Sequence, residues 1–204
     1  MSYRRKNYKK IVICGSGGVG KTTLIKTFET KSFFAHTVMT IAVDHHLLCL
    51  NVDEKTPLAL LIWDLSGQKR FFDMCAGAIK TFEKYCQRAD IVLICFDLSD
   101  LDTLEEIPQW IGLLPSGTPK ILVGTKKDKD ESMTELVKPY LAEFDFLSYI
   151  ETSAKDDMDS VCEVFEELLT QILPINREES HRIVKKYLIG GCYLEAKTYV
   201  ANTN

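Results

Sequence analysis

The sequence predicts an α/β fold, in which helices cover both faces of a six-stranded, mostly parallel sheet with one antiparallel edge strand. Short apolar runs alternate with segments of helical periodicity along the 204 residues. The run 91–96 is apolar at every position, as a central parallel strand requires when helices cover both of its faces. A glycine-rich loop directly follows the first apolar run and is typical of a strand-to-helix turn.

The expected elements follow in chain order from these runs and from the turn residues between them. Strands are expected over residues 10–14, 42–51, 58–64, 91–97, 120–124 and 146–151. Helices are expected over residues 21–31, 75–88, 103–113, 133–143 and 158–173. A short turn at 53–55 joins the second and third strands, so we expect these two to form the antiparallel hairpin.

The loop over residues 15–22 reads Gly-Ser-Gly-Gly-Val-Gly-Lys-Thr and fits the phosphate-loop pattern G-x-x-x-x-G-K-[ST]. Glycines let successive backbone N–H groups turn toward a phosphate, while Lys21 supplies a positive charge and Thr22 a hydroxyl for Mg²⁺. A helix that begins near Lys21 would point its positive end at the same anion. Phosphate contacts are therefore expected from Gly15, Ser16, Gly17, Gly18, Val19, Gly20, Lys21, Thr22 and the adjacent Thr23.

The nucleotide base is expected at the end of a later strand, where Thr125, Lys126 and Asp128 follow residues 120–124. A carboxylate at Asp128 can accept hydrogen bonds from both N1–H and the exocyclic amine of guanine, a donor pair that adenine lacks. The alkyl stem of Lys126 can lie along the plane of the base. The segment therefore favours a guanine nucleotide.

A second base-contacting segment is expected after the strand 146–151. There the N–H of Ala154 can donate to guanine O6, with Ser153 and Lys155 on either side. The carboxyl ends of parallel strands meet at one edge of a sheet, so this segment, the phosphate loop and Asp128 are expected to form one site.

The chain resembles the Ras superfamily of small GTPases in four motifs that occur in that family's order. They are the phosphate loop, the Asp-Leu-Ser-Gly-Gln segment at 64–68, the Thr-Lys-Lys-Asp segment at 125–128 and the Ser-Ala-Lys segment at 153–155. The resemblance spans roughly residues 8–173, and segments 40–44 and 68–71 are most similar to the Rab branch. It implies the G domain fold of P-loop NTPases, with GTP or GDP and Mg²⁺ bound and GTP slowly hydrolysed to GDP.

The resemblance also implies which groups surround the γ-phosphate. Thr22, Thr40 and Asp64 are expected to hold Mg²⁺, the last of them through water, and the N–H of Gly67 is expected to reach a γ-oxygen. Gln68 is expected to orient the attacking water. The expected catalytic set is therefore Lys21, Thr40, Gly67 and Gln68.

Two of these assignments rest on spacing within the family's first switch segment. Thr40 lies 18 residues after Thr22, and Thr37 is the alternative metal ligand. Phe33 is 12 residues after the phosphate-loop lysine, which is the position of the aromatic residue that packs on guanine, and Phe34 is the alternative.

Three features depart from the family pattern. Thr125 stands where most relatives have asparagine, although the Rho branch also carries threonine there, so guanine specificity is expected to survive. Asp64 and Asp97 are 33 positions apart, about seven more than in Rab relatives, or about two helical turns. The extra length lies between Phe71 and Arg88, on the family's partner-facing surface.

The third departure is at the C-terminus. No C-a-a-X motif or terminal cysteine pair is present, so prenylation by the usual route is not expected.

Composition limits the partners and the compartment that we expect. The net charge of −4 provides no basic face for a nucleic acid. The seven cysteines lack disulfide or metal spacing, which indicates the reducing cytoplasm, with any membrane contact made through partners. No apolar run is long enough for a transmembrane segment. We expect a G domain over 1–175 and a tail over 176–204, in which a helix over 177–189 would carry an apolar stripe. We expect this stripe to pack on the G domain, and the alternatives are a contact with a partner or a second copy of the chain and reversible membrane binding.

The predicted function is a molecular switch that signals through two segments held by the γ-phosphate. Effectors, exchange factors and GTPase-activating proteins are its expected partners. The alternative is a GTP-locked interaction protein with little turnover. A small-molecule P-loop kinase is disfavoured by Asp128, by Ala154 and by the lack of a lid insertion.

Overall fold

The structure, a computed structural model, describes residues 8–35, 37–52, 57–67, 78–129 and 133–190. Within these residues one sheet contains six strands, in the order β2-β3-β1-β4-β5-β6. The strands are β1 (Tyr8–Cys14), β2 (Val43–Asn51), β3 (Pro57–Leu65), β4 (Ile91–Asp97), β5 (Lys120–Thr125) and β6 (Ser148–Glu151).

Every neighbouring pair in the sheet is parallel except β2 and β3, which pair antiparallel from Val43 with Leu65 to Asn51 with Pro57. The predicted fold class, with its antiparallel edge strand, is confirmed. β2 begins one residue later than predicted because Ala42 has a φ of 63°, outside the extended region.

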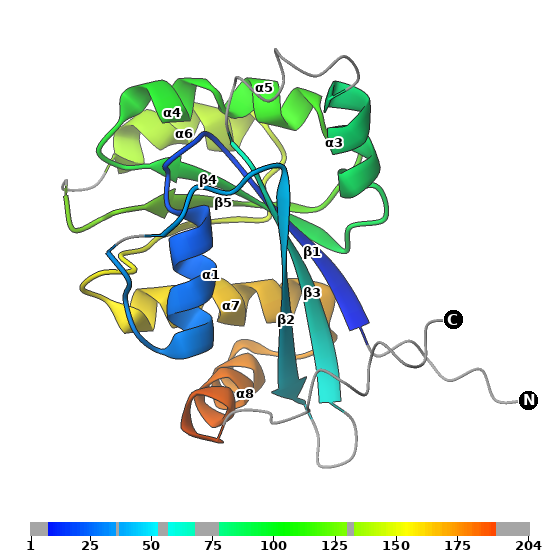
Figure 1. Ribbon diagram of the computed structural model, residues 1–204, viewed down its shortest axis with the longest axis vertical. Coiled ribbons are helices and arrows are strands. Elements are labelled where there is room, and N and C mark those ends of the chain that lie inside the picture. Colours follow the sequence, from blue (N-terminus) through cyan, green and yellow to red (C-terminus); the bar gives the residue numbers. More distant parts are fainter. Residues whose placement is uncertain (1–7, 36, 53–56, 68–77, 130–132, 191–204) are drawn as a thin grey trace, which may run out of the picture.

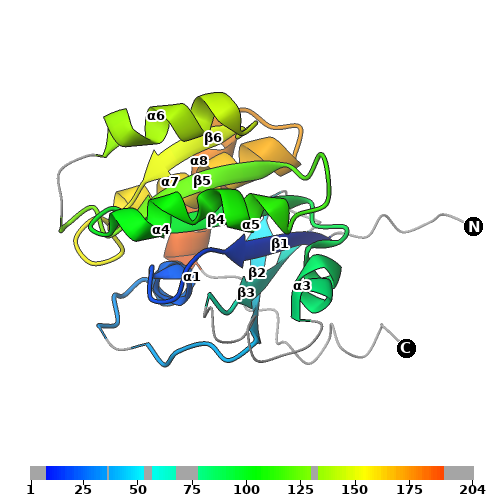
Figure 2. The same cartoon turned by 90° about the horizontal axis from the view of Figure 1, so that it is seen from above.

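The helices of the described chain cover the sheet in two layers (Figures 1 and 2). On one face lie α1 (Lys21–Thr30), α7 (Met158–Ile172) and α8 (Arg177–Gly190). On the other lie α3 (Ala78–Cys86), α4 (Leu101–Glu105), α5 (Ile107–Gly112) and α6 (Thr134–Glu143). The bounds of α1, α6 and α7 agree with the sequence prediction to within one residue, and none of the described helices is long and apolar enough to cross a membrane.

The single helix predicted over 103–113 is wrong, because the structure has two helices there. Asp100 caps α4 by accepting a hydrogen bond from the N–H of Asp102, so the first helix begins at Leu101. Pro108 has no N–H to donate to the carbonyl of Leu104, and the helical hydrogen bonding is interrupted at Glu106. The resulting joint places Glu106 beside the phosphate loop, where its side chain bonds Ser16.

Two other predicted bounds need comment. β6 is two residues shorter than the strand predicted over 146–151, because the N–H of Phe146 bonds back to the carbonyl of Phe144 in a local turn. The helix predicted over 75–88 is described over Ala78–Cys86. Residues 68–77, which include Gln68 and part of the predicted extra length, lie outside the described residues.

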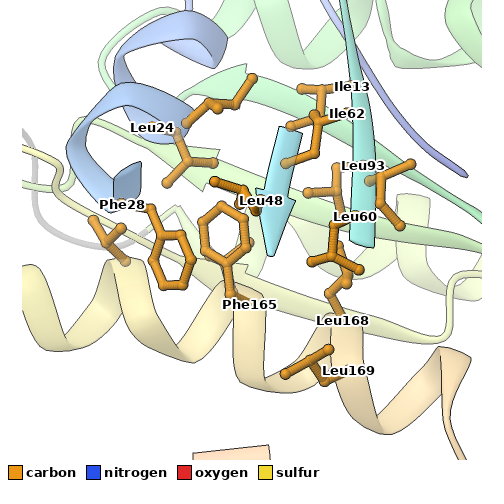
Figure 3. Close-up of a cluster of buried hydrophobic side chains, with 14 of the residues drawn as sticks. Ile13, Leu24, Phe28, Leu48, Leu60, Ile62, Leu93, Phe165, Leu168 and Leu169 are labelled. Carbon is orange, nitrogen blue, oxygen red and sulfur yellow. The ribbon is translucent and has the colours of Figure 1, made fainter. Parts of the chain in front are cut away.

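The core beneath α1 and α7 is centred on two stacked rings, Phe28 and Phe165, whose centroids are 3.7 Å apart (Figure 3). Leucine and isoleucine side chains of β2, β3 and β4 belong to the same buried cluster, and Figure 3 labels Leu48, which lies beside the rings, and Ile62 and Leu93, which lie farther along the sheet. Each such buried side chain stabilises the fold by about 1.5–3 kcal/mol. This packing fixes α1, and therefore the position of the phosphate loop that precedes it.

α8 extends this core. Ile183 and Val184 are buried against it, and the ring of Tyr187 stacks on Phe28 at a centroid distance of 5.1 Å. Two ion pairs, Arg177–Glu163 and Lys185–Asp159, and a His181–Glu166 hydrogen bond connect α8 to α7 among the described residues. Such partly exposed pairs each stabilise by about 1 kcal/mol or less, so the apolar stripe supplies most of the docking energy. The domain boundary at 175 stays a prediction, although α8 packs on the residues before it.

A matched pair of substitutions on α8 tests this packing. Ile183→Ala should lower the free energy of unfolding by about 2–5 kcal/mol, because Ile183 is 2% exposed and its removal leaves a cavity. Ile189→Ala on the same helix should change that free energy by about 0.5 kcal/mol or less, because Ile189 is 87% exposed. The two values come from urea unfolding, and equal effects would contradict intramolecular docking.

Candidate functional site

A pocket of about 420 Å³ opens at the carboxyl ends of the parallel strands, within the size range of ligand sites in proteins. Segments far apart in the sequence line it: residues 17–18, 20–24, 33–35, 37–40, 65–67, 125–126, 128–129, 152 and 154–155. The predicted site residues in its lining are Gly17, Gly18, Gly20, Lys21, Thr22, Thr23, Phe33, Thr40, Gly67, Thr125, Lys126, Asp128, Ala154 and Lys155. The structure therefore brings together most of the side chains that the sequence singled out.

The remaining predicted residues support this lining or lie elsewhere. Gly15, Ser16, Val19, Asp64 and Ser153 are not among the lining residues, but each of them is buried. Each also exchanges a hydrogen bond with a residue that lines the pocket. Gln68 lies outside the described residues.

Lys21 begins α1 and is buried beneath the phosphate loop. Its Nζ donates to the carbonyl oxygens of Gly15 at 2.7 Å and Ser16 at 2.8 Å. Burial lowers the pKa of Lys21, because a charged ammonium loses hydration there. A buried positive charge at the start of a helix favours an anion in the adjacent pocket.

Two glycines allow close approach of backbone segments at the loop. A Cβ at Gly15, whose φ is 132°, would collide with the carbonyl oxygen of Cys95. A Cβ at Gly67 would collide with the backbone carbonyls of Gly15 and Ser16. The segment after β3 can therefore lie directly on the phosphate loop only because residue 67 has no side chain.

Three oxygen-bearing side chains meet beside the loop. The hydroxyl of Thr22 bonds Asp64 Oδ2 and lies 3.0 Å from the hydroxyl of Thr40, which is 3.3 Å from the same carboxylate oxygen. Asp64 Oδ1 is buried and has no hydrogen-bond partner among the described residues. Burial raises the pKa of the Asp64 carboxyl, although the Thr22 hydrogen bond opposes this shift.

This cluster fits Mg²⁺, which prefers hydroxyl, carboxylate and water oxygens. A divalent cation would compensate the buried charge of Asp64, whose Oδ1 has no hydrogen-bond partner among the described residues. The alternative ligand Thr37 lies instead 3.4 Å from the hydroxyl of Thr23, away from this carboxylate. Phe33 and Phe34 both line the pocket, and the choice between them as the base-packing ring stays open.

On the other side of the pocket, Asp128 is held by neighbouring side chains. Ser153 Oγ donates to Asp128 Oδ1 at 2.7 Å, and Lys155 Nζ is 3.8 Å from Oδ2. These contacts leave lone pairs of the carboxylate available for pairing with two donors.

Thr125 retains a link to the phosphate loop in place of the asparagine of most relatives. Its hydroxyl bonds the carbonyl oxygen of Val19 and lies 2.8 Å from that of Phe96. A threonine hydroxyl has one proton, so it can donate fully to only one of these acceptors at a time. The bond to the phosphate loop is therefore present with threonine at this position.

The family model of the Ras family matches residues 10–174. The chain belongs to the Ras family. It is 32% identical over 166 residues to Ras-related protein Rab-32 of Homo sapiens, covering 76% of this chain and 71% of that protein. It is 31% identical over 182 residues to Ras-related protein Rab-9B of Homo sapiens, covering 84% of this chain and 86% of that protein. It is also 32% identical over 197 residues to Ras-related protein Rab-7b of Bos taurus, covering 92% of each.

These comparisons confirm the predicted resemblance: the chain is a Ras-like small GTPase of the Rab branch. Small GTPases of this family bind GTP and GDP and act as switches with regulators and effectors. The individual ligand contacts of this chain stay predictions.

Sequence analysis missed Asp97, which ends β4 and is 6% exposed. Its Oδ2 lies 2.6 Å from Lys126 Nζ, and the same ammonium donates to the carbonyl of Gly18 at 2.7 Å. Burial alone would raise the pKa of Asp97, but hydrogen bonds from Lys126 and Ser99 outweigh it and lower the pKa. The available signal was a carboxylate at the carboxyl end of a buried strand, as at Asp64.

Asp97→Asn should release bound GDP about tenfold faster than the unmodified GTPase, because a charge-assisted bond that holds Lys126 loses one charge. The measurement is displacement of a fluorescent GDP analogue in stopped flow. Ser99→Ala serves as the control, since it removes a hydroxyl from Asp97 but leaves the Lys126 pair. Equal release rates for Asp97→Asn and the control would rule out this role.

Proposed function

We propose that this small GTPase binds GTP and GDP with Mg²⁺ in the described pocket and hydrolyses GTP slowly, with the switch segments around residues 33–41 and 64–68 responding to the γ-phosphate. The observation that carries the proposal is the meeting of the Thr22 and Thr40 hydroxyls on Asp64, beside the buried ammonium of Lys21. Hydroxyls from α1 and from the segment before β2 converge there on a carboxylate of β3.

The metal ion would be held by Thr22, Thr40 and, through water, Asp64. When bound, it supplies positive charge that offsets the β- and γ-phosphate oxygens. Thr40 can contact it only while the segment before β2 lies over the pocket. Loss of the γ-phosphate would therefore release this segment, which gives the protein two states that a partner can distinguish.

Hydrolysis would depend on positioning and on charge. Lys21 would neutralise the γ-phosphate oxygens, and the backbone N–H of Gly67 would donate to one of them. Gln68, the next residue in the chain, would orient the attacking water. No described arginine lines the pocket, so rapid turnover would require one from a partner.

Guanine recognition would rest on Asp128, which accepts from the base, and on Ala154, whose N–H donates to O6. Lys126 would cover the base while Asp97 holds its ammonium. Ser153 and Lys155, which contact the two oxygens of Asp128, would help to hold its carboxylate in place.

Partner proteins would bind the segment before β2, which exposes apolar side chains. Val38 and Ile41 are each 85% exposed and Met39 is 67% exposed. Contiguous exposed apolar residues are typical of protein contacts. Effectors, exchange factors and GTPase-activating proteins are the proposed partners, and membrane attachment of this cytoplasmic protein would be made through them.

The base assignment is tested by Asp128→Asn. Xanthine carries a carbonyl where guanine carries its amine, and the mutant amide can donate to that carbonyl. We expect GDP affinity to fall at least about 100-fold and xanthosine diphosphate affinity to rise, as measured by competition titration. An unmodified protein that binds ATP as tightly as GTP would invalidate the guanine assignment.

The water-orienting role is tested by Gln68→Leu. GTP affinity should stay nearly unchanged while single-turnover hydrolysis slows at least tenfold, which corresponds to about 1.4 kcal/mol of activation free energy. Quenched-flow measurement of phosphate release gives the rate. Identical slow rates for both proteins would favour the alternative of a GTP-locked interaction protein.

A further inference from the structure

Behind the phosphate loop, Ser16 is held by two side chains from the joint between α4 and α5. Its hydroxyl donates to Glu106 Oε2 and accepts a hydrogen bond from the indole Nε1–H of Trp110 at 3.4 Å. Ser16 is 6% exposed and Trp110 is 5% exposed. A buried hydroxyl with both a donor and an acceptor partner has a fixed orientation, because breaking either bond leaves a buried polar group unpaired.

The backbone of Ser16 is in contact with two groups that the proposed mechanism uses. Its carbonyl oxygen accepts from Lys21 Nζ at 2.8 Å. The same carbonyl lies against Gly67, closely enough that a Cβ at Gly67 would collide with it. A shift of this peptide unit would therefore move both Lys21 and Gly67.

Trp110 also contacts α3, the helix that follows the second switch segment. Its ring lies 5.7 Å from the ring of Phe82 between centroids, at an interplanar angle of 48°. Phe82 is 4% exposed, so both rings are part of the core on this face of the sheet. Close packing transmits small displacements between such buried rings. Trp110 is thus in direct contact with the phosphate loop on one side and with α3 on the other.

The break in the helix at Glu106 makes this arrangement possible. A continuous helix over 103–113 would donate the N–H of residue 108 to the carbonyl of Leu104, but Pro108 has no N–H. The backbone N–H groups of Gln109 and Trp110 both bond the Glu106 carbonyl, which anchors the carboxylate and the indole to the same turn.

We propose that Glu106 and Trp110 are positioning residues for the phosphate loop, and that Trp110 couples the γ-phosphate state of the nucleotide to α3 through Ser16. This inference rests on the proposed GTP switch. It predicts that the surroundings of Trp110 differ between the GDP and GTP states, and that removing the Ser16 hydroxyl weakens this difference.

The spectroscopic test uses the full chain with Trp63→Phe, which leaves Trp110 as the single tryptophan because the sequence contains two. We expect its emission to change when GDP is exchanged for a non-hydrolysable GTP analogue. Adding Ser16→Ala should reduce this change by at least half. An emission that is identical with both nucleotides, or a change that Ser16→Ala leaves intact, would overturn the inference.

A kinetic test separates positioning from simple destabilisation. Trp110→Phe keeps an aromatic ring against Phe82 but removes the indole N–H, and Glu106→Ala removes the acceptor. Each variant should release GDP about two- to tenfold faster than the unmodified protein. When either variant is combined with Ser16→Ala, the increase in release rate should be smaller than the product of the two separate increases. Glu106→Gln, which keeps an acceptor oxygen, should restore most of the slow release. Additive effects, or no rescue by glutamine, would contradict positioning through Ser16.

Binding of a fluorescent guanine nucleotide is measured on the Trp63→Phe protein before these tests. Failure to bind would overturn the proposed function and this inference together. Tight binding with an unresponsive Trp110 would overturn this inference alone.

Discussion

The parallel sheet requires the carboxyl ends of β1, β3, β4, β5 and β6 to meet at one edge, and the other features of the site depend on that constraint. Each strand delivers one chemical group there: the phosphate loop after β1, Asp64 from β3, Asp97 from β4, Thr125 from β5 and the Ser153 segment after β6. The hydrogen-bonded strands, of which β4 is buried at every position, fix where these groups lie. Because the groups are already in place, ligand binding loses less conformational entropy in ordering the site.

Several charged groups at this edge are buried, which costs free energy unless they are paired. Lys126 and Asp97 compensate each other at 2.6 Å. Lys21 bonds only carbonyl oxygens among its described hydrogen-bond partners, and Asp64 keeps an unpartnered oxygen. Buried charges without a partner of opposite charge are expected at functional sites. Here the positive charge of Lys21 suits an anion, and the negative charge of Asp64 suits a cation bound beside it.

The sequence predicted the sheet, its one antiparallel pair and most of the pocket lining, because apolar strand runs and short motifs are local signals. It failed at the α4–α5 joint, because the prediction followed helical periodicity over 103–113 and did not use Pro108 as a break. It also missed Asp97, Glu106 and Trp110, whose partners lie 29, 90 and 94 positions away in the chain. Contacts at such separations follow from packing, which no local pattern encodes. The choice of Thr40 over Thr37 as the metal ligand rested on its spacing of 18 residues from Thr22, and it stays a prediction.

The central claim is that a guanine nucleotide occupies this pocket and is turned over slowly. The most direct measurement is to denature the purified protein and identify the released nucleotide by anion-exchange chromatography. The account predicts GDP in stoichiometric amount, since bound GTP would be hydrolysed during purification. An adenine nucleotide, or GTP that is retained without conversion, would contradict it.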